Sequence, residues 1–443
     1  MINEAPLDPS LLPPGLRELD AARVADEFGT PTFVYDEDEV RRRCRDYVAG
    51  FGADAVAYAG KAFLCTAMAR LVVEEGLHLD CATSGELHVA RHAGVPGERI
   101  VLHGNNKSDQ ELGAALDAGV GRIVADSFDE LDRLEALAGA RGLQPTVLVR
   151  VTPGVEAHTH EYIETGTEAS KFGFTLTDGV ALAAIRRVAA SPVLQLAGLH
   201  CHIGSQISRL DAFGRAIERL AALAAELARD PQAGDRTGDE TGNGAAIRIE
   251  ELNLGGGLGA RYLADDRELE IADYASYLRS AVERCWSAEG LDARPRVMVE
   301  PGRSIVASAA ITLYRVGTVK QIPGIGTYVA VDGGMSDNPR PVLYGAGYEA
   351  YLPEHLGEAR PLHCAVVGKH CEQGDVLVAD ACLPAGVKIG DLLATPTTGA
   401  YGYSMASNYN KVTRPAVVFV RDGEPRLVVR RETDDDLTRL DVD

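Results

Sequence analysis

The sequence predicts an α/β protein that combines a parallel (β/α)8 TIM barrel with a mostly antiparallel β-domain. Three observations predict this fold. Short apolar runs recur about every 23 residues from residue 55 onward, with an amphipathic, helix-like stretch between each pair. Signals for the start and end of helices fall between these runs. After about residue 305 the chain changes to short β-branched runs that are broken by Gly and Pro.

Eight apolar runs are expected to form the strands of the barrel. The runs are Ala55–Ala59, Leu77–Cys81, Ile100–His103, Ile123–Asp126, Thr146–Val151, Leu194–Cys201, Ile247–Leu254 and Arg296–Glu300. The segments between them carry three residue pairs with the spacing of a capping box, Thr83/Glu86, Ser108/Glu111 and Ser127/Glu130, and three glycines where helices should end, Gly76, Gly94 and Gly119. Eight parallel strands that alternate with helices form a TIM barrel.

The β-domain is predicted from runs on both sides of the barrel. Those after the barrel are Thr318–Ile322, Thr327–Val331, Asp375–Val378, Val417–Val420 and Arg426–Val429, and we expect Thr32–Tyr35 to join the same sheet. The predicted division is an N-terminal segment (1–47) that contributes to the β-domain, the barrel (48–305) and the C-terminal β-domain (306–443). Residues 229–246 are rich in Gly, Asp and Thr, which predicts a mobile surface insertion without a catalytic role.

Composition excludes several classes of partner. Lys and Arg number 44 against 65 Asp and Glu, and the resulting net charge of −21 repels phosphate backbones and anionic lipid surfaces, so we expect neither nucleic acid nor membrane as a partner. The N-terminus has no basic region followed by an apolar one, which predicts a cytoplasmic protein. The eight cysteines include no Cys-x-x-Cys pair, which argues against a zinc site and a disulfide framework, and no metal is expected.

The ends of the predicted barrel strands are unusually polar. They are Lys61, His103, Arg150, His202–Ser205, Gly255–Gly257 and Glu300–Arg303. In a TIM barrel the C-terminal strand ends carry the chemistry. Burial there would lower the pKa of the Lys61 ammonium group, and the neutral amine is the form that makes a Schiff base with a carbonyl or with pyridoxal phosphate. The alternative is a lysine that merely extends from a strand end into solvent.

Three consecutive glycines, Gly255–Gly257, allow backbone N–H groups to converge on an anion. Late-strand loops are where barrels commonly hold phosphate, and Ser205 and Arg303 could add donors to the same phosphate. Taken singly, a glycine run is usually a turn and a histidine at a strand end usually has a structural role. Together on one face of a barrel, the lysine, phosphate cradle, carboxylate and histidine fit pyridoxal phosphate.

Seven motifs carry a resemblance to a known family. They are Tyr58–Lys61, Gly198–Gln206, Asn253–Gly257, Glu300–Ser304, Asp332–Pro341, His370–Asp375 and Thr398–Asn410. In these motifs and their order the chain resembles the diaminopimelate decarboxylase family, which belongs with the ornithine and arginine decarboxylases to the fold type III pyridoxal-phosphate enzymes. The resemblance covers nearly the whole chain. It implies pyridoxal 5'-phosphate as the cofactor, a small amino acid as the substrate, and a homodimer with shared active sites.

The resemblance also implies a role for each matching residue. Lys61 would bind the cofactor covalently, His202 would pack against its ring, and Glu300 would face its pyridine nitrogen. The phosphate would be held by Ser205, Gly255, Gly256, Gly257 and Tyr401, with Arg303 nearby. The carboxylate at the non-reacting end of the substrate would be bound by Arg303, Arg340 and Tyr344, with Tyr401 also in contact. Glu372 would bind the ammonium group at that end, and Cys371 would protonate the carbanion.

The carboxylate of Glu300 favours one reaction over another. A negative charge beside the pyridine nitrogen raises its pKa and strengthens the electron sink, whereas an arginine there, as in racemases of this fold, would weaken it. We therefore expect decarboxylation of meso-2,6-diaminopimelate at its D-centre to L-lysine and carbon dioxide, the last step of lysine biosynthesis. The alternatives are a decarboxylase of ornithine or arginine and a non-catalytic cofactor-binding homologue. Gly60, Phe63 and Gln373 depart from the residues commoner in the family.

Overall fold

The computed structural model describes residues 5–155, 170–229 and 247–442. Contacts divide the chain into two compact units. The barrel unit comprises Cys44–Gly259 and Leu269–Pro301, and the sheet unit comprises Met1–Arg43, Ala260–Glu268 and Gly302–Asp443. Apart from Arg229, the insertion expected at 229–246 lies outside the described residues.

The barrel unit is built on eight parallel strands. They are β2 (Ala57–Ala59), β3 (His78–Cys81), β4 (Ile100–Leu102), β5 (Arg122–Ala125), β6 (Thr146–Thr152), β8 (Gln195–His200), β9 (Glu251–Asn253) and β10 (Arg296–Met298). Each strand pairs in parallel with its neighbour in this order. The ring closes through Val299, which accepts a hydrogen bond from Ala57 at 2.9 Å and donates one to Ala55 at 3.0 Å. The predicted TIM barrel is confirmed.

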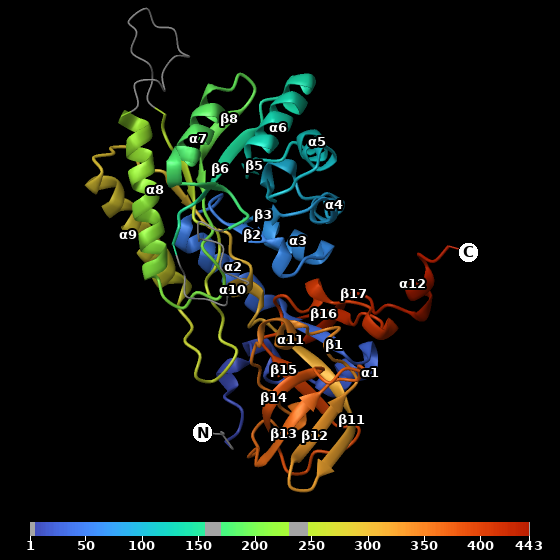
Figure 1. Cartoon of the computed structure of the whole chain (residues 1–443). Coiled ribbons are helices and arrows are strands. Elements are labelled where there is room, and N and C mark those ends of the chain that lie inside the picture. Colours follow the sequence, from blue (N-terminus) through green and yellow to red (C-terminus); the bar gives the residue numbers. More distant parts are fainter. Residues whose placement is uncertain (1–4, 156–169, 230–246, 443) are drawn as a thin grey trace, which may run out of the picture. The chain divides into compact units, whose positions relative to one another are not determined.

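Helices alternate with these strands and cover their outer side (Figure 1). They are α2 (Glu37–Phe51), α3 (Thr66–Glu74), α4 (Ser84–His92), α5 (Asp109–Ala118), α6 (Phe128–Arg141), α7 (Val180–Ala190), α8 (Asp211–Arg229) and α9 (Ile271–Ala288). A two-residue strand, β7 (Phe174–Thr175), pairs in parallel with the last residues of β6. Of the three expected capping boxes, Ser108 with Glu111 is complete. Thr83 and Ser127 do cap their helices, but the carboxylates of Glu86 and Glu130 bond elsewhere.

The sheet unit contains an eight-stranded sheet in which most pairs are antiparallel, as predicted. Its strands are β1 (Thr32–Asp36), β11 (Ala310–Ile322), β12 (Gly326–Val331), β13 (Leu362–Val367), β14 (Val376–Leu383), β15 (Leu392–Pro396), β16 (Ala416–Arg421) and β17 (Glu424–Val429). The N-terminal strand β1 lies between β11, its antiparallel neighbour, and β16, its parallel neighbour. The sequence prediction missed β13 and β15.

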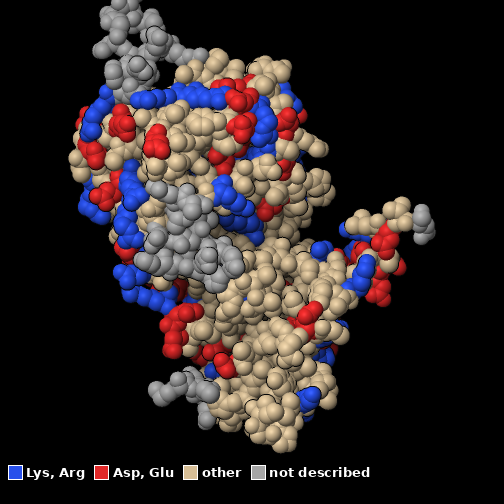
Figure 2. All heavy atoms as spheres, in the orientation of Figure 1, with Lys and Arg blue, Asp and Glu red and all other residues tan. Residues whose placement is uncertain are grey.

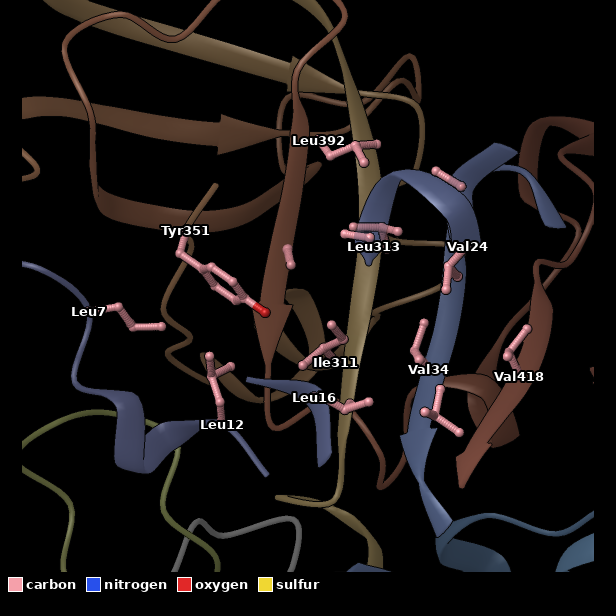
Figure 3. Close-up of a cluster of buried hydrophobic side chains, with 14 of the residues drawn as sticks. Leu7, Leu12, Leu16, Val24, Val34, Ile311, Leu313, Tyr351, Leu392 and Val418 are labelled. Atoms are coloured by element: carbon pink, nitrogen blue, oxygen red, sulfur yellow. The ribbon is translucent and has the colours of Figure 1, made fainter. Parts of the chain in front are cut away.

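One face of this sheet carries a buried apolar cluster (Figure 3). Leu7, Leu12 and Leu16 from the N-terminal turns pack there with Ile311 and Val418 from the strands. The unit also contains the short helices α1 (Ala21–Phe28), α10 (Arg303–Val306), α11 (Arg340–Tyr344) and α12 (Asp434–Thr438). The N-terminal segment is thus held to the C-terminal strands by a shared core, whose burial removes the leucine side chains from water.

Acidic and basic side chains are interspersed over the face drawn in Figure 2. The surface ion pairs of the described residues include those of Arg187 with Asp132 and Glu135. Within the described ranges, no helix is both long and apolar enough to cross a membrane.

Candidate active site

Each unit contains part of the predicted site. The barrel unit contains Lys61, His202, Ser205, Gly255, Gly256, Gly257 and Glu300. The sheet unit contains Arg303, Arg340, Tyr344, Cys371, Glu372 and Tyr401.

Lys61 lies in a 3-10 turn (Gly60–Ala62) that directly follows β2. Its side chain is exposed, and no hydrogen bond or ion pair holds its amine among the residues that the structure describes. Gly60 fits here because a Cβ atom would lie 2.9 Å from the carbonyl oxygen of Asp80. The sequence predicted a buried lysine at this strand end, whereas the structure places the side chain at the surface. The amine is nonetheless available to react.

A second lysine near a barrel strand end, Lys107, is not available. Its amine is buried and pairs with Glu130 at 2.8 Å, and it donates to the carbonyl oxygens of Gly104 at 2.6 Å and Val124 at 2.9 Å. Because an ammonium group has three hydrogens, these partners use all of its donors. The comparison favours Lys61 as the reactive amine.

Glu300 is the centre of a buried hydrogen-bonded group. Its Oε1 accepts from His103 Nε2 at 2.8 Å and Asn253 Nδ2 at 2.7 Å, and its Oε2 accepts from His200 Nε2 at 3.0 Å. Burial alone would raise the pKa of Glu300, but its electrostatic interactions and hydrogen bonds with His103 and His200 hold it well below its usual range. Each carboxylate oxygen accepts two hydrogen bonds, so Oε2 can take one further donor.

The pKa values of two histidines in this group shift in opposite directions. Burial lowers the pKa of His200 to about 4, which leaves its ring neutral. For His103, burial acts in the same direction, but the carboxylates of Asp80 and Glu300 raise its pKa overall. The atoms of His103, His200 and Glu300 lie within 4.8 Å of one another, close enough for a metal ion. The hydrogen bonds that join these side chains directly already explain why their atoms are close together. A zinc ion would instead need each atom about 2.0–2.2 Å from a common centre.

Asp80 in β3 is a buried carboxylate beside this group, with its Oδ1 3.7 Å from His103 Nε2. Burial raises its pKa to about 7, and the neighbouring Glu300 adds to the rise, whereas His103 and Lys61 oppose it. The sequence analysis did not identify Asp80. Its only signal in the sequence was an acidic residue within the run Leu77–Cys81, which was predicted to be a strand.

The glycine run is tightly enclosed. A Cβ atom would lie 2.6 Å from the Cys201 carbonyl oxygen at Gly255, 2.3 Å from the Glu300 carbonyl oxygen at Gly256, and 2.6 Å from the Gly204 carbonyl oxygen at Gly257. Gly255 and Gly257 also have φ values of +66° and +118°, which favour glycine. No other residue fits this run without displacing the backbone.

Two of the three glycine amides already have partners. Gly255 donates to Asn253 Oδ1 at 2.9 Å, and Gly256 donates to His202 Nδ1 at 3.2 Å. Within the described chain, only the amide of Gly257 has no acceptor among the three. Since Nδ1 of His202 accepts, its ring is neutral, and burial lowers its pKa well below the usual range. The available amine of Lys61, the remaining acceptor of Glu300, the neutral His202 ring and the Gly257 amide fit pyridoxal phosphate.

In the sheet unit, two buried arginines lie among tyrosines. Arg303 Nη1 donates to the Tyr262 hydroxyl at 2.6 Å, and its guanidinium carbon lies 4.7 Å from the centre of the Tyr401 ring. Arg340 lies 4.4 Å from the centre of the Tyr262 ring and donates to the Tyr348 hydroxyl. Arginine stacks favourably on aromatic faces. These contacts hold both guanidinium groups in fixed positions.

Arg340 lacks a counter-charge. Its side chain is buried, its Nε has no hydrogen-bond partner, and no carboxylate pairs with it in the part of the chain that the structure describes. A buried unpaired cation is costly to maintain and is often part of a binding site. The residue therefore fits the predicted role of binding a carboxylate.

Sequence reasoning missed Tyr262 and Tyr348. The hydroxyl bonded to Arg340 belongs to Tyr348, whereas the predicted Tyr344 is half-buried at the end of α11. The rings of Tyr262 and Tyr348 meet edge to face with centres 5.3 Å apart. Both tyrosines lie in irregular segments, and no motif in the sequence links them to the arginines.

Cys371 and Glu372 are exposed in a loop that several hydrogen bonds fix. Asp375 accepts from the backbone of Met335 at 2.6 Å and His370 at 2.8 Å, which joins two of the sequence motifs. The amide of Cys371 donates to Asn410 Oδ1 at 3.3 Å, and the hydroxyl of Tyr409 donates to Glu372. An ordered loop thus presents a thiol and a carboxylate side by side.

Comparison with known proteins gives a consistent result. Residues 37–307 match the family model described as the pyridoxal-binding domain of the pyridoxal-dependent decarboxylases. The diaminopimelate decarboxylase of Mycobacterium tuberculosis H37Rv is 51% identical over 425 residues, covering 95% of this chain and 93% of the relative. That of Bacillus subtilis 168 is 48% identical over 428 residues, covering 96% and 94%.

A solved structure agrees with these relatives. The crystal structure of diaminopimelate decarboxylase from M. jannaschii in complex with L-lysine has a TM-score of 0.84 and 32% identity, covering 96% of this chain and 94% of that chain. On these matches, which span the barrel and the β-domain alike, the chain belongs to the diaminopimelate decarboxylase family of pyridoxal-dependent decarboxylases.

Proposed function

We propose that the chain catalyses the reaction that gives its relatives their name, decarboxylation of meso-2,6-diaminopimelate at its D-centre to L-lysine and carbon dioxide. The observation that supports this substrate most directly is the buried guanidinium group of Arg340, which has tyrosine neighbours but no counter-charge in the described chain. A substrate with a carboxylate at its non-reacting end would provide that counter-charge. Ornithine and arginine have no carboxylate there.

Residues of the barrel unit would hold the cofactor. Lys61 would attach it covalently, His202 would pack against its ring, and Ser205 and Gly257 would contribute to the phosphate site, to which Tyr401 of the sheet unit would add its hydroxyl. When bound, pyridoxal phosphate supplies the electron sink for the pair left by the departing carbon dioxide. Glu300 stays ionised because His103 and His200 stabilise its charge, and its remaining acceptor on Oε2 would keep a proton on the ring nitrogen.

Residues of the sheet unit would bind and protonate the substrate. Arg303 and Arg340 would bind the distal carboxylate, with Tyr344 and Tyr348 as further donors, and Glu372 would accept from the distal ammonium group. Arg303, Arg340 and Glu372 together would recognise the distal end of the substrate as an L-amino acid, which leaves the D-centre to react. Cys371 would donate the proton that replaces the lost carboxylate, and Lys61 would then regain the cofactor as the product leaves.

We further propose a homodimer in which Cys371 and Glu372 of one subunit complete the site of the other. Their exposure on an ordered loop supports this arrangement, because a thiol that transfers a proton must be reachable. The cytoplasm is the location we propose. All eight cysteines are free thiols, as is usual in a reducing compartment.

One experiment tests the proposed function. The purified protein, loaded with pyridoxal phosphate, is incubated separately with meso-diaminopimelate, L-ornithine, L-arginine and L-lysine, and carbon dioxide and amine products are measured. We expect carbon dioxide and L-lysine from diaminopimelate and at least tenfold lower kcat/KM for the others. Equal turnover of ornithine would replace the proposal with a decarboxylase of basic amino acids. No turnover of any of them by cofactor-loaded protein would favour a non-catalytic homologue.

A further inference from the structure

The sheet unit contains a cavity of about 270 Å³ that none of the residues proposed for the reaction lines. Its walls come from the N-terminal turns at residues 10–17, the start of α2, the segment 261–268, and Ser308. Pockets for drug-sized ligands measure about 300–1,000 Å³, so this cavity suits a smaller molecule.

The charged groups of the cavity are mainly guanidinium groups. Its lining includes Arg17, Arg42, Arg43 and Arg261, against the carboxylates of Glu39 and Glu268. A third carboxylate, Asp8, pairs with Arg261 at 2.8 Å from outside the lining. Four cations therefore meet three anions, in a protein whose net charge is −21. A local positive excess of this kind attracts anions.

Most of these guanidinium groups have carboxylate partners. Arg43 donates to Glu39 at 2.7 Å and to Glu268 at 3.0 Å. Arg42 also donates to Glu39, at 2.7 and 2.8 Å. Arg17 is different, because its Nε donates to the carbonyl oxygen of Leu12 at 3.2 Å and no carboxylate pairs with it among the described residues. Arg17 is the cation left over.

Ser308 provides an independent sign of a missing partner. Its Oγ is buried and has no hydrogen-bond partner in the described part of the chain. A buried hydroxyl without a partner loses its hydrogen bonds to water without replacement, which is unfavourable. An oxygen atom of a ligand in the cavity would accept from this hydroxyl.

We propose that this cavity binds a small oxyanion with at least two oxygen atoms, such as phosphate or a short dicarboxylate. The anion would accept from Arg17 and Ser308 and would gain from the positive excess of the other arginines. Phosphate and carboxylate share this chemistry, since guanidinium groups bind both in a bidentate manner.

The site is linked to the residues proposed to bind substrate. Arg43 also donates to the carbonyl oxygen of Ser304 at 2.9 Å, next in the chain to Arg303. Arg261 directly precedes Tyr262, whose hydroxyl accepts from Arg303. An occupant of the cavity would therefore lie beside Arg43, which holds the backbone next to Arg303, and beside Arg261, the chain neighbour of Tyr262.

Calorimetric titration of the cofactor-loaded protein with inorganic phosphate at constant ionic strength tests this proposal, with malonate as a second arm. We expect one saturable site per chain for at least one of the two anions. The anion that binds more tightly identifies the class of ligand. Arg17→Gln should weaken binding at least tenfold, and Ser308→Ala severalfold. The matched control is Arg23→Gln, which removes an exposed arginine of the same unit that pairs with Glu424, and it should bind like the wild type.

A second control separates this site from the proposed substrate site. Arg340→Ala should retain anion binding, because Arg340 does not line the cavity. The proposal is overturned if neither anion binds, if both Arg17→Gln and Ser308→Ala bind like the wild type, or if Arg340→Ala alone abolishes binding. None of these binding measurements depends on decarboxylation, so a negative result for the anion site would be distinguishable from a failure of the proposed function.

Discussion

Replacement of Arg340 with methionine should damage catalysis while leaving the fold intact. The substrate would lose two charge-assisted hydrogen bonds, at about 1.5–3 kcal/mol each, so kcat/KM for diaminopimelate should fall about 10²–10⁴-fold. The protein itself loses the cation–π contacts with Tyr262 and Tyr348, about 0.5–2 kcal/mol each, but is relieved of a buried Nε without a partner. These terms offset, and the free energy of unfolding should change by no more than about 2 kcal/mol.

Arg360→Met is the matched control, with the opposite expected pattern. Arg360 is equally buried in the same unit, but it pairs with Glu349 at 3.0 Å and donates to the carbonyl oxygen of Ala5 at 2.8 Å. Its loss leaves a half-buried carboxylate unpaired, which should destabilise the protein by about 3 kcal/mol. Because Arg360 contacts none of the proposed site residues, kcat/KM should stay within about threefold of the wild type.

Steady-state kinetics and thermal unfolding of both cofactor-loaded variants check this pair of expectations. Kinetics are measured with diaminopimelate and with L-ornithine, at a temperature where both variants are folded. Arg340→Met should reduce turnover of diaminopimelate far more than any turnover of ornithine. The reasoning is refuted if Arg340→Met leaves the ratio between the two substrates unchanged, or if it lowers Tm as much as Arg360→Met does while kcat/KM is retained.

Three further predictions follow from the site. Borohydride reduction should fix the cofactor on Lys61, located by peptide mass analysis, and a label on Lys107 would contradict the assignment. Inactive Lys61→Ala and inactive Cys371→Ala subunits, mixed and exchanged, should regain part of the activity, since one hybrid site is then intact; no recovery after confirmed exchange would place each site in one chain. The pKa of Asp80 is about 7 when folded and about 3.9 when unfolded, so its protonated form stabilises the fold below about pH 4 and this contribution is lost as the pH rises through 7. Between pH 4 and 7 the free energy of unfolding of the wild type should therefore decline by on the order of 1 kcal/mol per pH unit through Asp80, and Asp80→Asn should remove this decline. The check is Tm measured against pH on cofactor-free protein, and parallel Tm curves for the two proteins would contradict the prediction.

Much of the fold could be predicted because buried parallel strands consist of continuous apolar runs. All eight barrel strands were located from their apolar residues, although charged residues interrupt the later runs, such as Ile247–Leu254. Of the two missed strands of the sheet, β13 begins Leu362-His363-Cys364, where an exposed histidine interrupts the apolar pattern. β15 (Leu392–Pro396) is fully buried and begins with three apolar residues, so its short run was overlooked rather than absent. Their assignment depends on pairing with β12, β14 and β11, which are distant in the sequence.

The site was predictable to the extent that its residues follow apolar runs or lie in motifs. Lys61 and Glu300 could be identified because a strand places each at the C-terminal edge of the barrel. Tyr262 and Tyr348 could not, because only the folded chain brings their rings to Arg303 and Arg340. The use of two glycine amides by Asn253 and His202 was likewise invisible, since hydrogen-bond partners are set by tertiary structure.

The place of β1 between β11 and β16 has a consequence for synthesis of the protein. Translation produces Thr32–Asp36 before the barrel, whereas the neighbouring strands at Ala310–Ile322 and Ala416–Arg421 emerge after it. Both edges of the nascent β1 therefore remain unpaired while nearly three hundred residues are added. Unpaired strand edges promote aggregation. The barrel unit can complete its ring once Val299 has emerged. A chain that stops before residue 416 would carry β1 with one edge permanently open.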